Sequence, residues 1–285
     1  MGFDLATIEF LLRAREAGVS LERVLTIGRQ GVYVDAAQLR ATAARHGIAL
    51  EAGEAERILT EQKGYCEPLL KRMGAGEIDS LDVSPYEGAT ILHDLNQPLP
   101  EAHHNRYSLV VDGGSLEHVF HLPTAMKSCM QAVAPGGHYI AINPANNMMG
   151  HGFYQLSPDL FFKSLTPANG FEVIKILLYE ETKPSIWYEV MNPEQIRARV
   201  ELTNHRLTYM IAWGRKTRSV PIFEETPQQT IYAAIWEKSA GKTLGVADTN
   251  PRGPASFWKR HAPAWMAKTY RALRPFHPRL YKRVQ

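Results

Sequence analysis

Hydrophobic residues along the chain form two kinds of pattern. Short apolar runs bounded by turn residues are typical of buried strands, and apolar residues three or four positions apart are typical of amphipathic helices. Strand-like runs occupy residues 23–27, 78–82, 89–94, 107–112, 138–143, 171–179 and 206–213. Helix-like spacing occupies residues 3–17, 35–46, 53–73, 122–133, 158–165 and 193–203, and residues 230–236 fit either element. This alternation predicts an α/β protein with a doubly wound, mostly parallel sheet.

Composition divides the chain into three parts. We expect an N-terminal helix over residues 1–20, an α/β domain over 21–238, and a linker with a C-terminal arm over 239–285. No apolar run approaches the ~20 residues of a membrane-spanning helix. The N-terminus lacks a signal-peptide pattern, and Cys66 and Cys129 fit no metal spacing. These features predict a cytoplasmic protein that contacts a membrane at most from its surface.

The C-terminal arm is strongly basic. The net charge of the chain is +3, yet residues 251–285 carry nine Lys or Arg and no acid, which leaves about −6 for the rest. Five aromatic side chains lie among these cations, at Trp258, Trp265, Tyr270, Phe276 and Tyr281. Such a segment fits an anionic membrane surface, and it also fits docking on the acidic body or on a second subunit. Nucleic acid is a weaker alternative, because no recognised nucleic-acid module accompanies the arm.

A glycine turn after the first strand is the first candidate ligand site. In Gly28-Arg-Gln-Gly31 the glycines allow a sharp turn and close approach of the backbone to a ligand. A dinucleotide fingerprint needs a third glycine at position 34, which is Val34. A plain turn between strand and helix is the alternative.

Acids follow three later strand-like runs, at Asp82, Asp94 and Asp112. Ligands of open α/β sheets bind outside the carboxyl ends of the strands, so an acid there is suited to accept hydrogen bonds from a ribose or an adenine amino group. Each acid has the alternative role of a helix cap or turn residue. Glu51 competes with Asp82 for the ribose, but its surroundings lack the β-branched residues of a strand.

These motifs together resemble the class I S-adenosylmethionine-dependent methyltransferases, which have a Rossmann-like fold. The resemblance covers roughly residues 20–180 and is most specific at Ala134-Pro-Gly-Gly137, which precedes a strand-like run. It implies S-adenosylmethionine as cofactor. Its methionine portion would lie at Gly28 and Gly31, its ribose at Asp82, and its adenine at Asp94 and Leu95. The chain departs from the family at Thr26, Arg29 and Gln30, where an acid and small residues are usual.

The run Tyr107–His121 places an acid and a histidine after a buried strand. We expect Asp112 and Gly113 to line the cofactor side, with Glu117 and His118 facing the acceptor. A histidine beside an acid is suited to remove a proton from an acceptor hydroxyl. His118 and His121 are three apart, so a metal site on a shared helical face is an alternative, but no metal is predicted.

A polar loop follows the next strand. Residues 143–155 concentrate amides, a histidine and a tyrosine, as a pocket for a polar acceptor requires. His151 is the second candidate base, and Asn146, Tyr154 and Gln155 are the candidate substrate-binding residues. A loop of caps and turns is the alternative.

The sequence therefore predicts methyl transfer from S-adenosylmethionine to a small polar acceptor, with a hydroxyl of a saccharide or glycolipid precursor as its target. Two other functions remain open. One is a nicotinamide-dependent oxidoreductase, and the other is a non-catalytic nucleotide-binding or scaffold protein that has kept the fold. The oligomeric state is left open.

Overall fold

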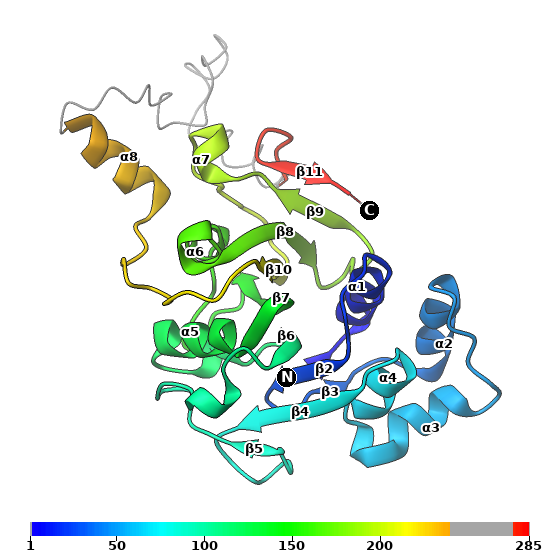
Figure 1. Cartoon of the computed structure of the whole chain (residues 1–285). Helices are drawn as coiled ribbons and strands as arrows, with labels where there is room; N and C mark the ends of the chain where they lie inside the picture. Colours follow the sequence, from blue (N-terminus) through cyan, green and yellow to red (C-terminus); the bar gives the residue numbers. More distant parts are fainter. Residues whose placement is uncertain (1, 240–275, 285) are drawn as a thin grey trace.

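The fold is built on a nine-stranded sheet with the order β11-β9-β8-β10-β7-β6-β2-β4-β5 (Figure 1). The structure is a computed structural model that describes residues 2–239 and 276–284. The strands of this sheet are β2 (Arg23–Ile27), β4 (Glu77–Asp82), β5 (Ile91–Leu92), β6 (Tyr107–Asp112), β7 (Val133–Asn146), β8 (Phe171–Glu180), β9 (Trp187–Val190), β10 (Thr208–Lys216) and β11 (Tyr281–Arg283).

Seven of these nine strands run in the same direction. Strands β5, β4, β2, β6 and β7 pair in parallel, and β10 pairs antiparallel with both β7 and β8. Strand β9 is antiparallel to β8 and β11. Only β9 and β10 are therefore reversed within this sheet, which confirms the expected α/β class with a mostly parallel sheet.

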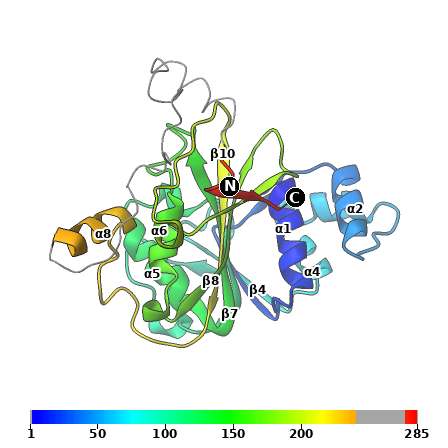
Figure 2. The same cartoon turned by 90° about the horizontal axis from the view of Figure 1, so that it is seen from above.

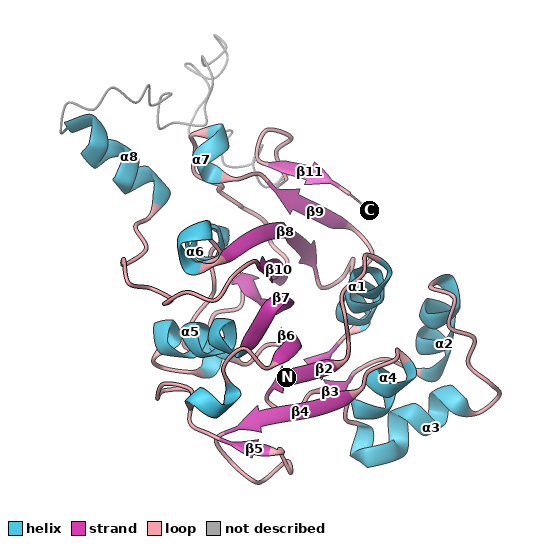
Figure 3. Cartoon of the chain, in the orientation of Figure 1, coloured by secondary structure: helices cyan, strands magenta, loops and turns pink. Residues whose placement is uncertain are grey.

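Helices cover both faces of the sheet. Figure 2 shows α1, α2 and α4 on one side of the sheet and α5, α6 and α8 on the other, and Figure 3 separates helices from strands by colour. The α-helices are α1 (Leu5–Glu16), α2 (Ala36–Arg45), α3 (Glu54–Thr60), α4 (Glu67–Arg72), α5 (Leu122–Ala132), α6 (Pro158–Ser164), α7 (Pro193–Ile196) and α8 (Thr230–Ser239). Short 3₁₀ turns are η1 (Glu61–Gly64), η2 (Glu101–His103), η3 (Leu116–His118) and η4 (Pro167–Asn169).

Two apolar cores lie on the two faces of the sheet. In β6, Leu109 and Val111 belong to one core, whereas Val110 belongs to the other. Successive strand residues point to opposite faces, so a strand covered by helices on both sides carries consecutive apolar residues, as β6 does at 109–111. This is why 107–112 could be recognised as a buried strand.

The chain after β2 differs from the expected turn into a helix. Residues Gly31–Val32 form β3, which pairs in parallel with β1 (Gly2–Phe3) in a separate two-stranded sheet. Helix α2 begins only after that pairing, with Asp35 as its N-cap. The turn and the helix are both present, but a strand separates them.

Two other segments are shorter than expected, and one ambiguity is resolved. Of residues 89–94 only β5 is a strand, and of 193–203 only α7 is helical. Helix α7 ends where Arg197 takes a left-handed conformation, with φ of 49°. Residues 230–236 are helical, because they belong to α8.

The C-terminal end joins the main sheet. Strand β11 pairs with β9, although it comes from the segment that the sequence assigns to the linker and arm. Most of the basic arm lies outside the described residues, and so its predicted contact with an anionic membrane surface stays a prediction. In the described part of the chain, no helix has the length and apolar character to cross a bilayer.

Candidate functional site

The carboxyl ends of four parallel strands meet at one edge of the sheet. Ile27 at the end of β2 lies opposite Leu81 of β4 and Asp112 of β6, and Asp82 lies opposite Leu92 of β5. The chain order reverses at β2, because β4 and β5 lie on one side of it and β6 and β7 on the other. Ligands of doubly wound sheets bind at such a switch point. The strand-end residues singled out from the sequence all follow strands at this edge: Gly28, Asp82, Asp94 and Asp112.

The glycine turn is held in place by its own neighbours. Gly28 has a positive φ of 70°, and its N–H donates to Leu81 O at 2.7 Å. Arg29 forms an ion pair with Glu67 at 2.6 Å and stacks over the ring of Tyr65. The arginine that replaces a small residue in this turn is therefore bound toward α4.

Gly31 does not line the switch point in the expected way. It pairs with Gly2 in the two-stranded sheet, and a Cβ on Gly2 would lie 2.3 Å from the Gly31 carbonyl oxygen. The second glycine of the turn thus allows the N-terminal strand to approach closely.

Gln30 is the residue of this turn that reaches between β2 and β6. Its side chain is fully buried, and its amide nitrogen donates to Ile27 O and to Ser115 Oγ. Its Oε1 has no hydrogen-bond partner. Gly113, directly after β6, leaves room for this oxygen, because a Cβ at that position would lie 2.6 Å from it. In the sequence, Gln30 stands out only as a departure from a family pattern.

The acids after β4 and β5 each stabilise a local turn through one carboxylate oxygen. Asp82 Oδ1 accepts from the backbone N–H of Ser84 at 2.9 Å. Asp94 Oδ1 accepts from both the backbone and the side-chain amide of Asn96, and these bonds lower the pKa of Asp94. Leu95 beside it is buried. Both acids therefore stabilise turns, as the alternative prediction had it. The second carboxylate oxygen of each accepts no hydrogen bond from the described residues.

Two buried acids, at the end of β6 and in the middle of η3, are joined by an amide. Asn143 Nδ2 donates to Asp112 Oδ2 at 2.7 Å and to Glu117 Oε2 at 3.1 Å. Burial raises the pKa of Asp112, although Asn143 and three backbone N–H groups oppose it. Burial and the charge of Asp112 raise the pKa of Glu117. The pair therefore holds protons more readily than exposed carboxyl groups do.

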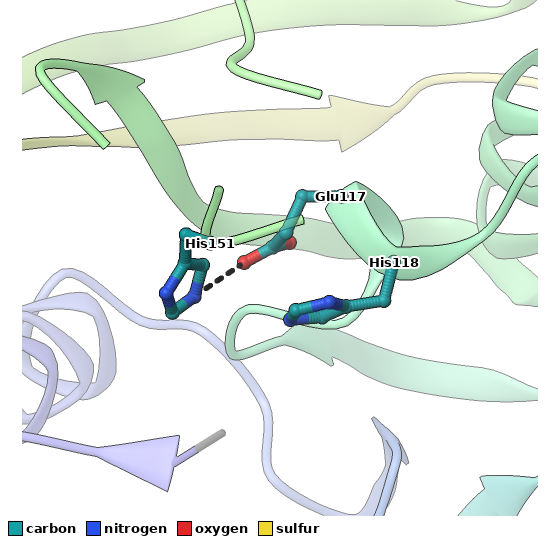
Figure 4. A group of neighbouring side chains, drawn as sticks. All are labelled: Glu117, His118 and His151. Atoms are coloured by element: carbon teal, nitrogen blue, oxygen red, sulfur yellow. Dashed lines mark ion pairs between the residues drawn. The ribbon is translucent and has the colours of Figure 1, made fainter. Parts of the chain in front are cut away.

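Glu117 faces two histidines across the mouth of the site (Figure 4). His151 Nε2 lies 3.8 Å from Glu117 Oε1, an oxygen that has no hydrogen-bond partner. The ring of His118 lies 5.3 Å from that of His151 between centroids. Partial burial and the neighbouring His151 lower the pKa of His118, which favours its neutral form. The structure thus brings together the three residues predicted as catalytic.

His121 does not share a helical face with His118. The 3₁₀ turn η3 ends at His118, and α5 begins at Leu122 with His121 as its N-cap. The imidazole that lies next to His118 is instead that of His151. His151 is in a separate loop, so its distance in sequence gives no indication of this contact. The idea of a metal site on His118 and His121 is therefore wrong.

The predicted substrate-binding residues hold the loop after β7. Asn146 donates to Asn204 Oδ1 at 2.9 Å, and Tyr154 OH donates to Phe120 O at 2.7 Å. Gln155 Oε1 accepts from the N–H of Met148 at 2.8 Å. Their contact with a substrate remains a prediction, and the cap-and-turn role accounts for these bonds.

Exposed apolar side chains surround the mouth of the site. Phe120 and Phe153 are 62% and 66% exposed, and their rings meet edge to face at 5.8 Å. Met149, in the same loop as His151, is 95% exposed. Solvent-exposed aromatic rings next to buried polar groups are typical of a binding surface.

A cleft is formed where α3, η1 and α4 lie against the start of β4. It has a volume of about 600 Å³ and is lined by residues of α3, η1 and α4, together with Ile78 and Thr90. Its charges are largely paired, as in Arg29–Glu67 and Arg72–Glu54. Because it contains none of the histidines or strand-end acids, we place the chemistry at the switch point.

Asn143 is a functional candidate that the sequence does not single out as an individual residue. It lies at the inner end of the polar segment 143–155, and it is fully buried. The sequence does contain a signal for it. The apolar strand-like run 138–143 ends in the amide Asn143, as the run 107–112 ends in the acid Asp112.

Comparison with known proteins gives similarity at the level of the fold. No protein-family model matches the chain, and no curated protein matches it.

The putative sarcosine dimethylglycine methyltransferase of Galdieria sulphuraria is 12% identical, with a TM-score of 0.43, over 75% of this chain and 86% of that one. The 1,6-didemethyltoxoflavin-N1-methyltransferase of Burkholderia thailandensis is 11% identical, with a TM-score of 0.41, over 75% and 78%. The 4+2 cyclase SpnF is 13% identical, with a TM-score of 0.42, over 75% and 81%. Such identities concern the fold alone.

Proposed function

We propose that this chain transfers a methyl group from S-adenosylmethionine to a small polar acceptor, with a hydroxyl of a saccharide or glycolipid precursor as the target. One observation carries the proposal. Unsatisfied buried acceptors lie on both sides of Gly113 and Gly114, at the switch point of the sheet. Gln30 Oε1 lies on the β2 side and Glu117 Oε1 on the side of His151.

The residues at the switch point fit the polar groups of S-adenosylmethionine. A buried oxygen without a partner is costly, so Gln30 Oε1 gains from a bound donor such as the ammonium group of the methionine portion. The free oxygens of Asp82 and Asp94 suit the ribose hydroxyls and the adenine amino group, and Leu95 offers an apolar contact. When bound, S-adenosylmethionine supplies a methyl group on a positively charged sulfur.

The acceptor side would be formed by His151, His118 and Glu117. A neutral histidine next to a carboxylate is suited to take the proton of an acceptor hydroxyl. His151 Nε2 would receive that proton, and Glu117 in its ionised form would stabilise the charged imidazole, whose positive charge in turn favours ionisation of Glu117. The remaining rate enhancement would come from holding donor and acceptor in contact.

The exposed rings of Phe120 and Phe153 favour an acceptor with an apolar face. The C–H face of a sugar ring, or the chain of a lipid, can pack on such rings, while a hydroxyl reaches the polar groups behind them. This is the structural support for a saccharide or glycolipid acceptor.

Two measurements test the proposal. S-adenosylmethionine or S-adenosylhomocysteine is expected to raise the Tm of the full-length chain, whereas NADH is expected to leave it unchanged. Stabilisation by NADH alone would support the oxidoreductase instead. Radiolabelled methyl transfer to a panel of saccharides and glycolipid precursors then tests the acceptor. Donor binding without transfer to any acceptor would support the non-catalytic alternative.

A further inference from the structure

The three side chains at the mouth of the site have a second property, which is the geometry of metal ligands. Glu117, His118 and His151 each offer one ligand atom, and these atoms all lie within 4.8 Å of one another. No other group of three or more such residues meets this distance in the described part of the chain. We propose that these residues bind a divalent transition-metal ion such as Zn²⁺.

The spacing needs only small side-chain movements to close around an ion. Tetrahedral Zn²⁺ with bonds of ~2.1 Å places its ligand atoms about 3.4 Å apart. Glu117 Oε1 and His151 Nε2 are already 3.8 Å apart. Both imidazoles are exposed at the surface, so rotation of their side chains can bring the ligand atoms to that separation.

Glu117 is oriented as a metal ligand by the groups around it. Its Oε2 accepts from Asn143, which leaves Oε1 without a partner on the side of His151. The side chain is 1% exposed, and a buried carboxylate oxygen gains most from a cation in contact with it. Carboxylates that bind metal ions are commonly held by a further hydrogen bond of this kind.

Backbone bonds fix His151 relative to Glu117. The N–H groups of Phe153 and Tyr154 both donate to the carbonyl oxygen of Glu117. A Cβ on Gly152 would lie 2.7 Å from the same oxygen, so glycine there permits this close approach. The loop that carries His151 is therefore tied to the turn that carries Glu117 and His118.

The ligand set indicates the class of metal. Two imidazole nitrogens and one carboxylate suit Zn²⁺ and neighbouring transition metals, whereas Mg²⁺ and Ca²⁺ prefer oxygen ligands. Three protein ligands leave a coordination position open, as in catalytic zinc sites. An acceptor hydroxyl bound there would lose its proton more easily, to water at the exposed mouth of the site. This role rests on the proposed methyl transfer, and in it His151 is a ligand rather than the base.

The ion site is tested without methyl donor or acceptor. Zinc chloride titrated into the full-length chain in a calorimeter is expected to bind at one ion per chain. Replacing Zn²⁺ by Co²⁺ is expected to give the visible absorption of a tetrahedral cobalt site. His118→Ala and His151→Ala are each expected to weaken Zn²⁺ binding at least ~10-fold. The matched control, His205→Ala, removes an exposed histidine outside the group and is expected to bind as wild type.

The outcomes separate this proposal from the proposed function. Absence of Zn²⁺ and Co²⁺ binding, or equal binding by wild type and both histidine variants, would overturn the metal site. Metal binding that depends on the two histidines supports it, even if no methyl transfer is found. Methyl transfer that continues unchanged in a chain freed of metal by a chelator would overturn the role of the ion in that reaction.

Discussion

Glu117 Oε1 lies 3.8 Å from His151 Nε2, and these two residues come from segments that follow neighbouring parallel strands. Glu117 is in the turn after β6, and His151 is in the loop after β7. Glu117 is buried and His151 is half-exposed. The pair therefore extends from the protein interior to the surface at the carboxyl edge of the sheet. The candidate chemistry of this protein depends on that connection.

Glu117→Gln is expected to lower methyl transfer by ~10²-fold or more, because the neutral amide can neither stabilise a charged His151 nor bind a metal ion as a carboxylate does. The dissociation constant of S-adenosylhomocysteine should stay within about twofold, since the proposed donor site is formed by Gln30 and the strand-end acids and does not include Glu117. Steady-state rates and calorimetry measure the two effects. Glu101→Gln, at an exposed position, is the control. Unchanged turnover in Glu117→Gln would remove Glu117 from the reaction.

Asn143→Ala is expected to destabilise the fold by ~1–3 kcal/mol, because two buried carboxyl groups lose their shared donor. Urea unfolding at pH 7 measures this difference. Asn143→Asp places a third acid there, so its stability should improve as the pH falls and the acids gain protons. Wild-type stability in Asn143→Ala would contradict the bridging role of the amide.

Gly113→Ala is expected to cost ~1–3 kcal/mol of folding stability, since the new methyl group would meet the Gln30 side chain. In a Gln30→Ala background most of that cost should disappear, because the contacted atoms are gone. A double-mutant cycle by urea unfolding gives the coupling. The same cost in both backgrounds would mean that Gln30 does not occupy this space.

Acid unfolding is expected to involve Glu9, a buried residue of α1. Burial acts to raise the pKa of Glu9, but bonds from Arg45, His46 and Arg13 outweigh it and lower the pKa. A lowered pKa in the folded state gives stability that is present above the unfolded pKa and lost as the pH falls through the folded one. Glu9→Gln should therefore reduce the loss of stability below about pH 4.5. Glu22→Gln, which changes an exposed acid shortly after α1, should not.

The regular part of the fold could be predicted from the sequence because burial leaves a periodic signal. Residues 107–112 were recognised as a strand with the observed bounds, since apolar residues on both faces end at Asp112. The two-residue strands β1 and β3 could not be found in this way, because two residues show no period. Their pairing depends on Gly2 and Gly31, which are far apart in the sequence.

The site was only partly predictable for the same reason. Glu117 and His118 were identified because they follow a buried strand, and His151 because it lies in a polar loop. Their proximity, and the Asn143 amide that joins Glu117 to Asp112, are long-range relationships. These pairs can be recognised only once β6 and β7 are known to be neighbours in the sheet. A single sequence does not give that pairing.

The most direct test of the account is calorimetric titration of S-adenosylhomocysteine into the wild-type chain and into Gln30→Met. The methionine keeps the volume of the side chain and removes Oε1 together with the Nε2 donor to Ile27 and Ser115, and Gln228→Met, at an exposed position, is the matched control. We expect the wild type and Gln228→Met to bind one ligand per chain, and Gln30→Met to bind at least ~10-fold more weakly, as the loss of a hydrogen bond to a charged group requires. Absence of binding by the wild type, or equal binding by all three proteins, would contradict the assignment of the switch point as the donor site.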